Sequence, residues 1–164
     1  TYFLAFLVYG PMMDPDGGRS CSTLASFLSY YLNYIFDDVR LIRSDSVTES
    51  IEEIHRIGDE DVIIAISFPR YSVKTIQTVS FAKNRKAKII AITDGAQSPL
   101  AKYADCSIYA GSDMVSFVDS LVAPLSVVNV LLAALSMRYK DSVTDTMLSM
   151  ESIWNTMNEY EHID

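Results

Sequence analysis

Five short apolar segments, separated by stretches with helical periodicity, constrain the fold of this chain more than any other feature. Within each segment the apolar residues follow one another instead of alternating with polar residues. Such runs are typical of strands that are covered on both faces, as in a parallel sheet. The predicted strands are Tyr2–Tyr9, Val39–Ile42, Asp61–Ser67, Lys88–Thr93 and Ser107–Tyr109.

Helical patterns fill the intervals between these strands. In the first interval, Leu24, Phe27 and Leu28 recur at three- and four-residue spacing. The alternation of strand and helix predicts an α/β fold, with a parallel sheet of five strands and right-handed crossovers. The predicted helices are Ser20–Phe36, Val47–Ile57, Val73–Arg85, Ser98–Ala104, Val115–Tyr139 and Ser142–Tyr160.

The composition places the chain among globular proteins. Its 164 residues suffice for one domain with a sizeable core, and we expect residues 1–164 to form that domain. The formal net charge of −8 disfavours nucleic-acid binding, which needs a basic surface. The two cysteines, Cys21 and Cys106, lack metal-ligand spacing. We therefore expect no metal site, no disulfide framework, no cofactor and a cytoplasmic location.

One uncharged segment, Ser120–Met137, tests this interpretation because its length approaches that of a membrane span. It contains Pro124 and Asn129 and has no aromatic belt, features that disfavour a span. A helix that is apolar on all sides is otherwise buried on all sides. We expect it to lie between the sheet and a second subunit, and not in a membrane.

Hydroxyl groups gather in the loops that leave the first and third predicted strands. In the common strand order 2-1-3-4-5, ligands bind beyond the carboxyl ends of these two strands. Both loops lead into a helix, whose unpaired N–H groups and partial positive charge suit an anion such as a phosphate. The alternative is that the serines only cap the helices. The candidate ligand-binding residues are Arg19, Ser20, Cys21 and Ser22 in the first loop, and Ser67, Arg70, Tyr71, Ser72 and Thr75 in the second.

Residues Asp61–Asp105 resemble the sugar isomerase (SIS) domain. More narrowly, the segments "ISFPRYS", "AITD", "SPLAKYAD" and "DSLVAPLSVVNVLLAAL" resemble the effector domain of RpiR-type bacterial transcription regulators. The resemblance implies a three-layer α/β/α sandwich that binds a sugar phosphate and forms homodimers or tetramers. Members of this family bind DNA through an N-terminal helix-turn-helix domain, which we expect to be absent from this chain.

The match to the SIS phosphate loops is incomplete. The second loop usually reads S-x-S-G-x-T/S-x-x-T, and Ser67, Ser72 and Thr75 agree with that pattern. A proline and Arg70 replace its second serine and its glycine. In the first loop, which usually reads G-x-G-x-S, Cys21 stands at the serine and could still donate its backbone N–H.

Aldose–ketose isomerisation needs a base that moves a proton between neighbouring carbons. The SIS isomerases that this chain resembles use a glutamate near the start of the helix after the fifth strand. Residues 111–120 contain no glutamate, only Asp113 and Asp119, and we expect His55 and His162 at the surface. We therefore predict a domain without catalytic residues, which senses a sugar phosphate and controls DNA binding by the absent domain. Two alternatives stay open: a sugar-phosphate isomerase or related SIS enzyme, and a structural dimerisation module.

Overall fold

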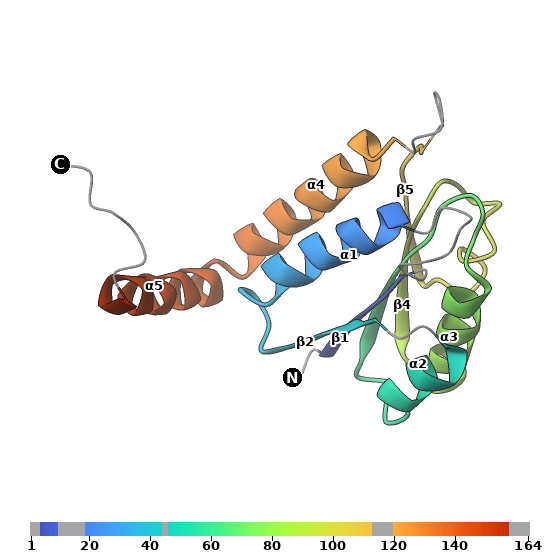
Figure 1. Ribbon diagram of the computed structural model, residues 1–164, viewed down its shortest axis with the longest axis horizontal. Coiled ribbons are helices and arrows are strands. Elements are labelled where there is room, and N and C mark those ends of the chain that lie inside the picture. Colours follow the sequence, from blue (N-terminus) through green and yellow to red (C-terminus); the bar gives the residue numbers. More distant parts are fainter. Residues whose placement is uncertain (1–3, 10–18, 44–45, 113–119, 158–164) are drawn as a thin grey trace.

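In the computed structural model, residues 4–9, 19–43, 46–112 and 120–157 are described, and for residues 4–9, 19 and 20 the description covers the backbone alone. Strands and helices alternate along most of this length, and two helices end it (Figure 1). In chain order the elements are β1 (Leu4–Tyr9), α1 (Arg19–Leu32), β2 (Asp38–Ile42), α2 (Val47–Glu53), β3 (Val62–Ile66), α3 (Val73–Asn84), β4 (Lys88–Thr93), β5 (Cys106–Tyr109), α4 (Val122–Arg138) and α5 (Lys140–Met157).

The sheet holds five strands in the order β2-β1-β3-β4-β5, and every neighbouring pair is parallel. Its register places Ile64 of β3 between Leu7 of β1 and Ile90 of β4. Because the strands are parallel, their carboxyl ends share one edge, from which α1 and α3 begin. The order reverses between β1 and β3, so α1 and the β3–α3 loop both begin at the edge where ligands of such sheets bind.

The side chains of β3 show how both faces of the sheet are covered. All five residues of this strand are buried. Val62, Ile64 and Ile66 lie in a core cluster with residues of α1 and α4, whereas Ile63 and Ala65 lie in a second cluster with residues of α3. Figure 1 accordingly shows α1 and α4 on one face and α2 and α3 on the other. The predicted α/β fold with a parallel sheet covered on both faces is confirmed.

One predicted helix is wrong: residues 98–104 form a series of turns. The backbone N–H of Ala101 donates to Ser98 O, and that of Tyr103 to Leu100 O, each at 3.1 Å and over three residues. The buried Ser98 Oγ also accepts the backbone N–H of Leu100 at 3.3 Å. A segment of about two turns gains little from the cooperativity of helix formation, and here the backbone closes successive turns over three residues instead.

Several other helix boundaries differ from the predictions, among them the end of α2, which is Glu53 rather than Ile57. Helix α4 begins at Val122 rather than Val115, because Ser120 and Leu121 are not helical; residues 115–119 lie outside the described ranges. Pro124 consequently lies in the first turn, where its missing N–H breaks no helical hydrogen bond. Helix α1 ends at Leu32 and continues only as turns. These differences leave the sheet and its loops unchanged.

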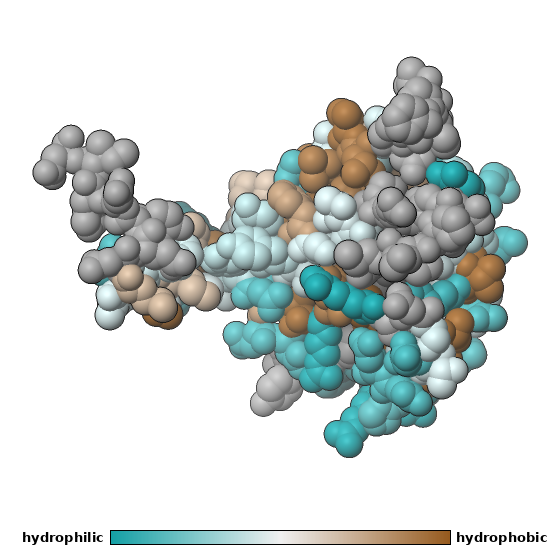
Figure 2. Space-filling model, viewed as in Figure 1, coloured by the Kyte–Doolittle hydropathy of each residue, from teal (hydrophilic) through white to brown (hydrophobic). Residues whose placement is uncertain are grey.

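Helix α4 packs on α1 with one face and leaves the other face open. Val128 is fully buried, whereas Val130 and Met137 are 69% and 80% exposed. Figure 2 shows hydrophobic residues over the beginning of α4, and Figure 1 shows α5 extending away from the sheet. The chain itself therefore covers α4 only in part, and its burial by a second subunit remains a prediction.

Within the described ranges, no single helix combines the length and apolar character of a membrane span. Helices α4 and α5 do so only as a pair, which is bent by 96° at the residue between them.

Candidate functional site

The loop between β3 and α3, residues 67–72, begins at the carboxyl end of β3, next to β1 in the sheet. Ser67 directly follows the strand and is only 3% exposed. Its backbone N–H donates to the carbonyl oxygen of Ile92 in β4 at 3.1 Å, so the pairing of β3 with β4 continues into the loop. The loop therefore starts from a fixed point at the edge of the sheet.

The N-terminus of α3 combines a capped helix end with an unpaired hydroxyl. Ser72 is the N-cap, and its Oγ accepts a hydrogen bond from the backbone N–H of Thr75 at 3.3 Å. Thr75 is fully buried, and its Oγ1 has no hydrogen-bond partner among the described residues. An unpaired buried hydroxyl costs about 1–3 kcal/mol, and helix capping gives no reason for it. The first-turn N–H groups and the positive end of the helix dipole make this terminus suitable for an anion.

Arg70 brings a positive charge to the same loop in an unusual backbone conformation. Its φ of 72° lies in the left-handed region, and the side chain is exposed. This conformation costs a residue with a Cβ about 1–2 kcal/mol, and glycine adopts it without that cost. Arg70 occupies the position where the phosphate-loop pattern has its glycine. The backbone thus keeps the glycine-type conformation while the side chain adds a guanidinium.

Tyr71 ties the loop to the next strand. Its hydroxyl donates to Asp94 Oδ1 at 2.7 Å, across 23 residues of sequence. Burial raises the pKa of the Tyr71 phenol above its ordinary value of 10.0, and the hydrogen bond to Asp94 and the charge of Asp94 raise it further. The phenol therefore stays protonated, and remains a donor, at neutral pH.

Asp94 belongs to a small polar network beyond the carboxyl end of β4, which the sequence analysis did not identify. Thr93 Oγ1 lies 3.1 Å from Asp94 Oδ1 and 2.8 Å from Ser98 Oγ, and both Thr93 and Ser98 are buried. The signal was present: "TD" follows an apolar strand, as "SFPRYS" follows the strand before it. The candidate site therefore extends from β3 to β4.

Only part of the first loop is described. Helix α1 begins at Arg19 on the same edge of the sheet, with the side chains of Arg19 and Ser20 outside the description. The Cys21 side chain is buried in the core cluster beneath α1, whereas Ser22 is partly exposed. The structure thus puts Ser67 at the end of β3, and Ser72 and Thr75 at the start of α3. Tyr71 is hydrogen-bonded to Asp94, just after β4. The binding role of both loops stays a prediction.

Potential metal ligands are scattered over the described residues. Within them, no three His, Cys, Asp or Glu side chains come together in a group that could hold a metal ion. His55 is exposed after α2, and its Nδ1 lies 2.7 Å from the carbonyl oxygen of Glu52. Asp113, Asp119 and His162 lie outside the described ranges.

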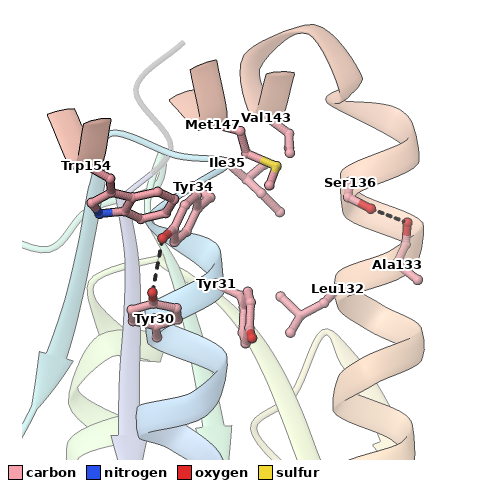
Figure 3. A pocket seen from close by; sticks show the side chains of 10 residues that line it. All are labelled: Tyr30, Tyr31, Tyr34, Ile35, Leu132, Ala133, Ser136, Val143, Met147 and Trp154. Carbon is pink, nitrogen blue, oxygen red and sulfur yellow. Dashed lines mark hydrogen bonds between the residues drawn. The ribbon is translucent and has the colours of Figure 1, made fainter. Parts of the chain in front are cut away.

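A separate groove lies where α1, α4 and α5 meet, with a volume of about 330 Å³ (Figure 3). Tyr31 of α1 faces Leu132 of α4 across it, and the hydroxyls of Tyr30 and Tyr34 lie 3.0 Å apart. The side chains that line it carry no charge at neutral pH. This groove therefore suits apolar packing, and the polar edge of the sheet suits an anion.

Comparison with known proteins finds a matching family model and a transcriptional regulator of similar sequence. A family model described as the SIS domain matches residues 18–134. An HTH-type transcriptional regulator of Caldanaerobacter subterraneus subsp. tengcongensis is 31% identical over 105 residues, which are 58% of this chain and 37% of that protein. The chain thus spans little more than a third of the length of this relative.

Two solved structures share the fold. The sugar isomerase domain of an RpiR transcription factor from Sphaerobacter thermophilus has a TM-score of 0.76 and 22% identity, and the match covers 92% of this chain and 78% of that chain. The Vibrio vulnificus NanR protein complexed with ManNAc-6P has a TM-score of 0.69 and 20% identity, over 92% of this chain and 56% of that chain. At these identities, the likeness concerns the fold.

Proposed function

Because the chain belongs to the SIS domain family, we propose that it is the phosphosugar-sensing effector domain of an RpiR-type transcriptional regulator. The similarity to an HTH-type regulator supports a regulatory role, and the NanR complex offers a phosphorylated amino sugar as a model ligand. In this proposal the DNA-binding domain is a separate N-terminal unit, and the protein acts in the cytoplasm. Ligand binding favours one arrangement of the assembled subunits by its higher affinity for that arrangement.

The observation that carries the proposal is the unpaired Thr75 hydroxyl beneath the N-terminus of α3. A phosphate there would accept hydrogen bonds from the Thr75 hydroxyl and from first-turn N–H groups. Ser72 would contribute a third donor at the helix start. The β3–α3 loop supplies both polarity and shape for such a group, since Ser67 is buried at its beginning and Arg70 is exposed on its rim.

The remaining predicted residues complete the proposed site. Ser22 supplies a hydroxyl from α1, and Cys21 contributes its backbone N–H rather than its buried thiol. Arg19 and Ser20 begin the same helix, whose positive end also faces the carboxyl edge of the sheet. The ligand would then bridge the loops after β1 and β3.

We also propose that the domain is not an enzyme. The stretch from residue 111 to 120 contains no glutamate to act as the isomerase base. An SIS isomerase remains the alternative function, and assays with hexose, pentose and amino-sugar phosphates distinguish the two. We expect no aldose–ketose conversion above background; steady turnover that Asp113→Asn abolishes would identify an isomerase instead.

The binding proposal is tested by calorimetric titration with ManNAc-6P and a panel of phosphorylated hexoses, amino sugars and sugar acids, each beside its unphosphorylated form. We expect binding only of phosphorylated compounds. Ser72→Ala should weaken it roughly 10- to 150-fold, since a hydrogen bond to a charged group contributes about 1.5–3 kcal/mol.

Ser46→Ala is the matched control for Ser72→Ala. Ser46 caps α2 as Ser72 caps α3, with Ser46 Oγ accepting the backbone N–H of Glu49 at 3.1 Å. Both variants should lose about 1 kcal/mol of folding stability. Only Ser72→Ala should lose affinity for the phosphorylated compounds. If the parent and both variants bind with equal affinity, Ser72 only caps the helix and does not bind the ligand.

A further inference from the structure

We propose that Asp94 is a positioning residue for the β3–α3 loop: it binds the Tyr71 hydroxyl and thereby holds Arg70 and Ser72 in the geometry that receives a phosphate. The inference rests on the proposed function and adds to it a residue directly after β4, outside both predicted loops. Asp94 acts through Tyr71 in this account, and not by contact with the ligand.

The first support is the place of Tyr71 between two residues of the candidate site. Arg70 has a left-handed backbone with φ of 72°, and Ser72 has an extended backbone with φ of −68° and ψ of 120°. A left-handed residue with a Cβ is strained by about 1–2 kcal/mol and persists where surrounding contacts hold it. The hydrogen bond from Tyr71 to Asp94 is such a contact, directly beside the strained residue.

The second support is that the loop is fixed at its two ends and the Tyr71 contact fixes its middle. At one end the Ser67 N–H binds Ile92 O at 3.1 Å; at the other, the Ile76 N–H binds Ser72 O at 3.1 Å in the first turn of α3. The 2.7 Å contact of Tyr71 with Asp94 joins the segment between them to β4. A hydrogen bond to a carboxylate is about twice as strong as one between neutral groups.

The third support is that Asp94 is itself held in place. Thr93 is fully buried, and its Oγ1 lies 3.1 Å from Asp94 Oδ1 and 2.8 Å from Ser98 Oγ. One hydroxyl proton serves one of these contacts at a time, while the Leu100 N–H donates to Ser98 Oγ at 3.3 Å. The carboxylate thus stands on a buried network that fixes its direction, as a positioning group requires.

Electrostatics also favours an indirect role. A free carboxylate beside a phosphate would repel it, since like charges at short range disfavour each other. A carboxylate that accepts a hydrogen bond from a tyrosine instead orients a neutral side chain. Asp94 then acts through the neutral Tyr71 side chain, and Arg70 in the same loop offers the opposite charge to the ligand.

The test uses the whole chain and NMR titration with inorganic phosphate and with ManNAc-6P. Tyr71→Phe and Asp94→Ala should each weaken binding roughly 10-fold, which corresponds to about 1.4 kcal/mol. The double variant should lose no more than either single variant, because both remove the same contact. Asp94→Asn should bind within about threefold of the parent, because its amide oxygen still accepts from Tyr71. Before any ligand is added, amide exchange at residues 68–72 should rise in Tyr71→Phe and stay unchanged in Asp94→Asn.

Tyr30→Phe is the control, because it removes a tyrosine hydroxyl contact, to Tyr34 at 3.0 Å, in the separate groove. It should bind like the parent. Additive losses of about 100-fold in the double variant would show that Asp94 contacts the ligand directly, and would overturn the inference. So would a parent-like affinity of Tyr71→Phe with unchanged exchange in the loop. If the parent itself binds neither probe nor any phosphosugar of the panel, the proposed function fails first, and the inference fails with it.

Discussion

At the scale of single residues, Arg70 is the least ordinary part of the candidate site. The structure has two residues other than glycine with positive φ in its described ranges: Arg70 at 72° and Lys86 at 70°. Lys86 follows the end of α3, at the edge of the sheet opposite the site, where its N–H donates to Lys83 O at 2.9 Å. The two residues share a backbone conformation and differ in location. Substitutions at the two positions therefore separate the effect of backbone strain on stability from the effect of the Arg70 side chain on binding.

Arg70→Gly and Lys86→Gly should change the free energy of unfolding by similar amounts, within about 1 kcal/mol of the parent. Each relieves left-handed strain, and each adds backbone freedom to the unfolded chain. Only Arg70→Gly should weaken phosphosugar binding, because, of these two residues, only Arg70 lies at the proposed site. Chemical denaturation and calorimetric titration measure the two effects. Equal phosphosugar affinities of the two variants would show that Arg70 does not contribute to binding.

The sequence could single out the β3–α3 loop because its signal is local. Three hydroxyl residues follow an apolar strand within nine positions; in the structure Ser67 lies at the end of β3, and Ser72 and Thr75 lie at the start of α3. Their role in binding stays a prediction. Asp94 could not be paired with Tyr71 in the same way, since that contact depends on the register of β3 and β4. Nor does a sequence pattern reveal that the Thr75 hydroxyl is unpaired, because that property depends on surrounding atoms.

At the scale of elements, Asp105 joins α3, β4 and β5. Its Oδ1 accepts a hydrogen bond from Lys83 Nζ at 2.7 Å, and its Oδ2 accepts the backbone N–H of Ile89 at 2.9 Å. The hydrogen bond from Lys83, followed by that from Ile89, lowers the pKa of Asp105 below its ordinary value of 3.8. The ionised carboxylate therefore stabilises the fold at pH values above 3.8, and this contribution is lost as the pH falls through the lowered pKa.

Asp105→Asn should accordingly reduce the free energy of unfolding at pH 7 by about 1 kcal/mol, a modest figure because the ion pair is partly exposed to solvent. The difference between variant and parent should shrink as the pH falls below the ordinary aspartate pKa, where the parent also loses its charge. Urea denaturation at several pH values measures this. A difference that stays constant down to pH 2 would contradict the assignment.

The elements that the sequence predicted best are those whose pattern is continuous. Strand β4 was predicted at both ends, because all its interior residues are apolar and polar residues flank them. The segment from residue 98 to 104 was predicted wrongly, because about two turns gain little from the cooperativity of helix formation and the backbone closes three-residue turns instead.

At the scale of the whole molecule, the family of the chain is shown, and its assembly into oligomers stays a prediction. The SIS resemblance found in the motifs is confirmed, since the SIS model matches residues 18–134. Helix α4 carries no charge before its last residue, and Val130 and Met137 on its outer side are largely exposed. An apolar face of this length on a monomer is unusual.

We expect the chain to form a dimer or larger assembly in which α4 is buried. Val130→Asp should produce a folded monomer, because this side chain is 69% exposed and its chain does not need it for packing. Val128 is fully buried in the chain, so a charge there would test folding and not assembly. Light scattering at micromolar concentration measures the mass. Thr48→Asp is the control, because it adds the same charge at an exposed position of α2, and this variant should assemble like the parent. A parent chain that is monomeric would contradict the prediction.

The central claim is that the N-terminus of α3 receives the phosphate of a sugar phosphate. A crystal structure of the chain with the tightest-binding compound of the panel tests it most directly. The account predicts phosphate oxygens within hydrogen-bonding distance of Ser72 Oγ and of Thr75 Oγ1, which then gains its partner. A phosphate bound elsewhere on the chain, with the Thr75 hydroxyl still unpaired, would contradict it.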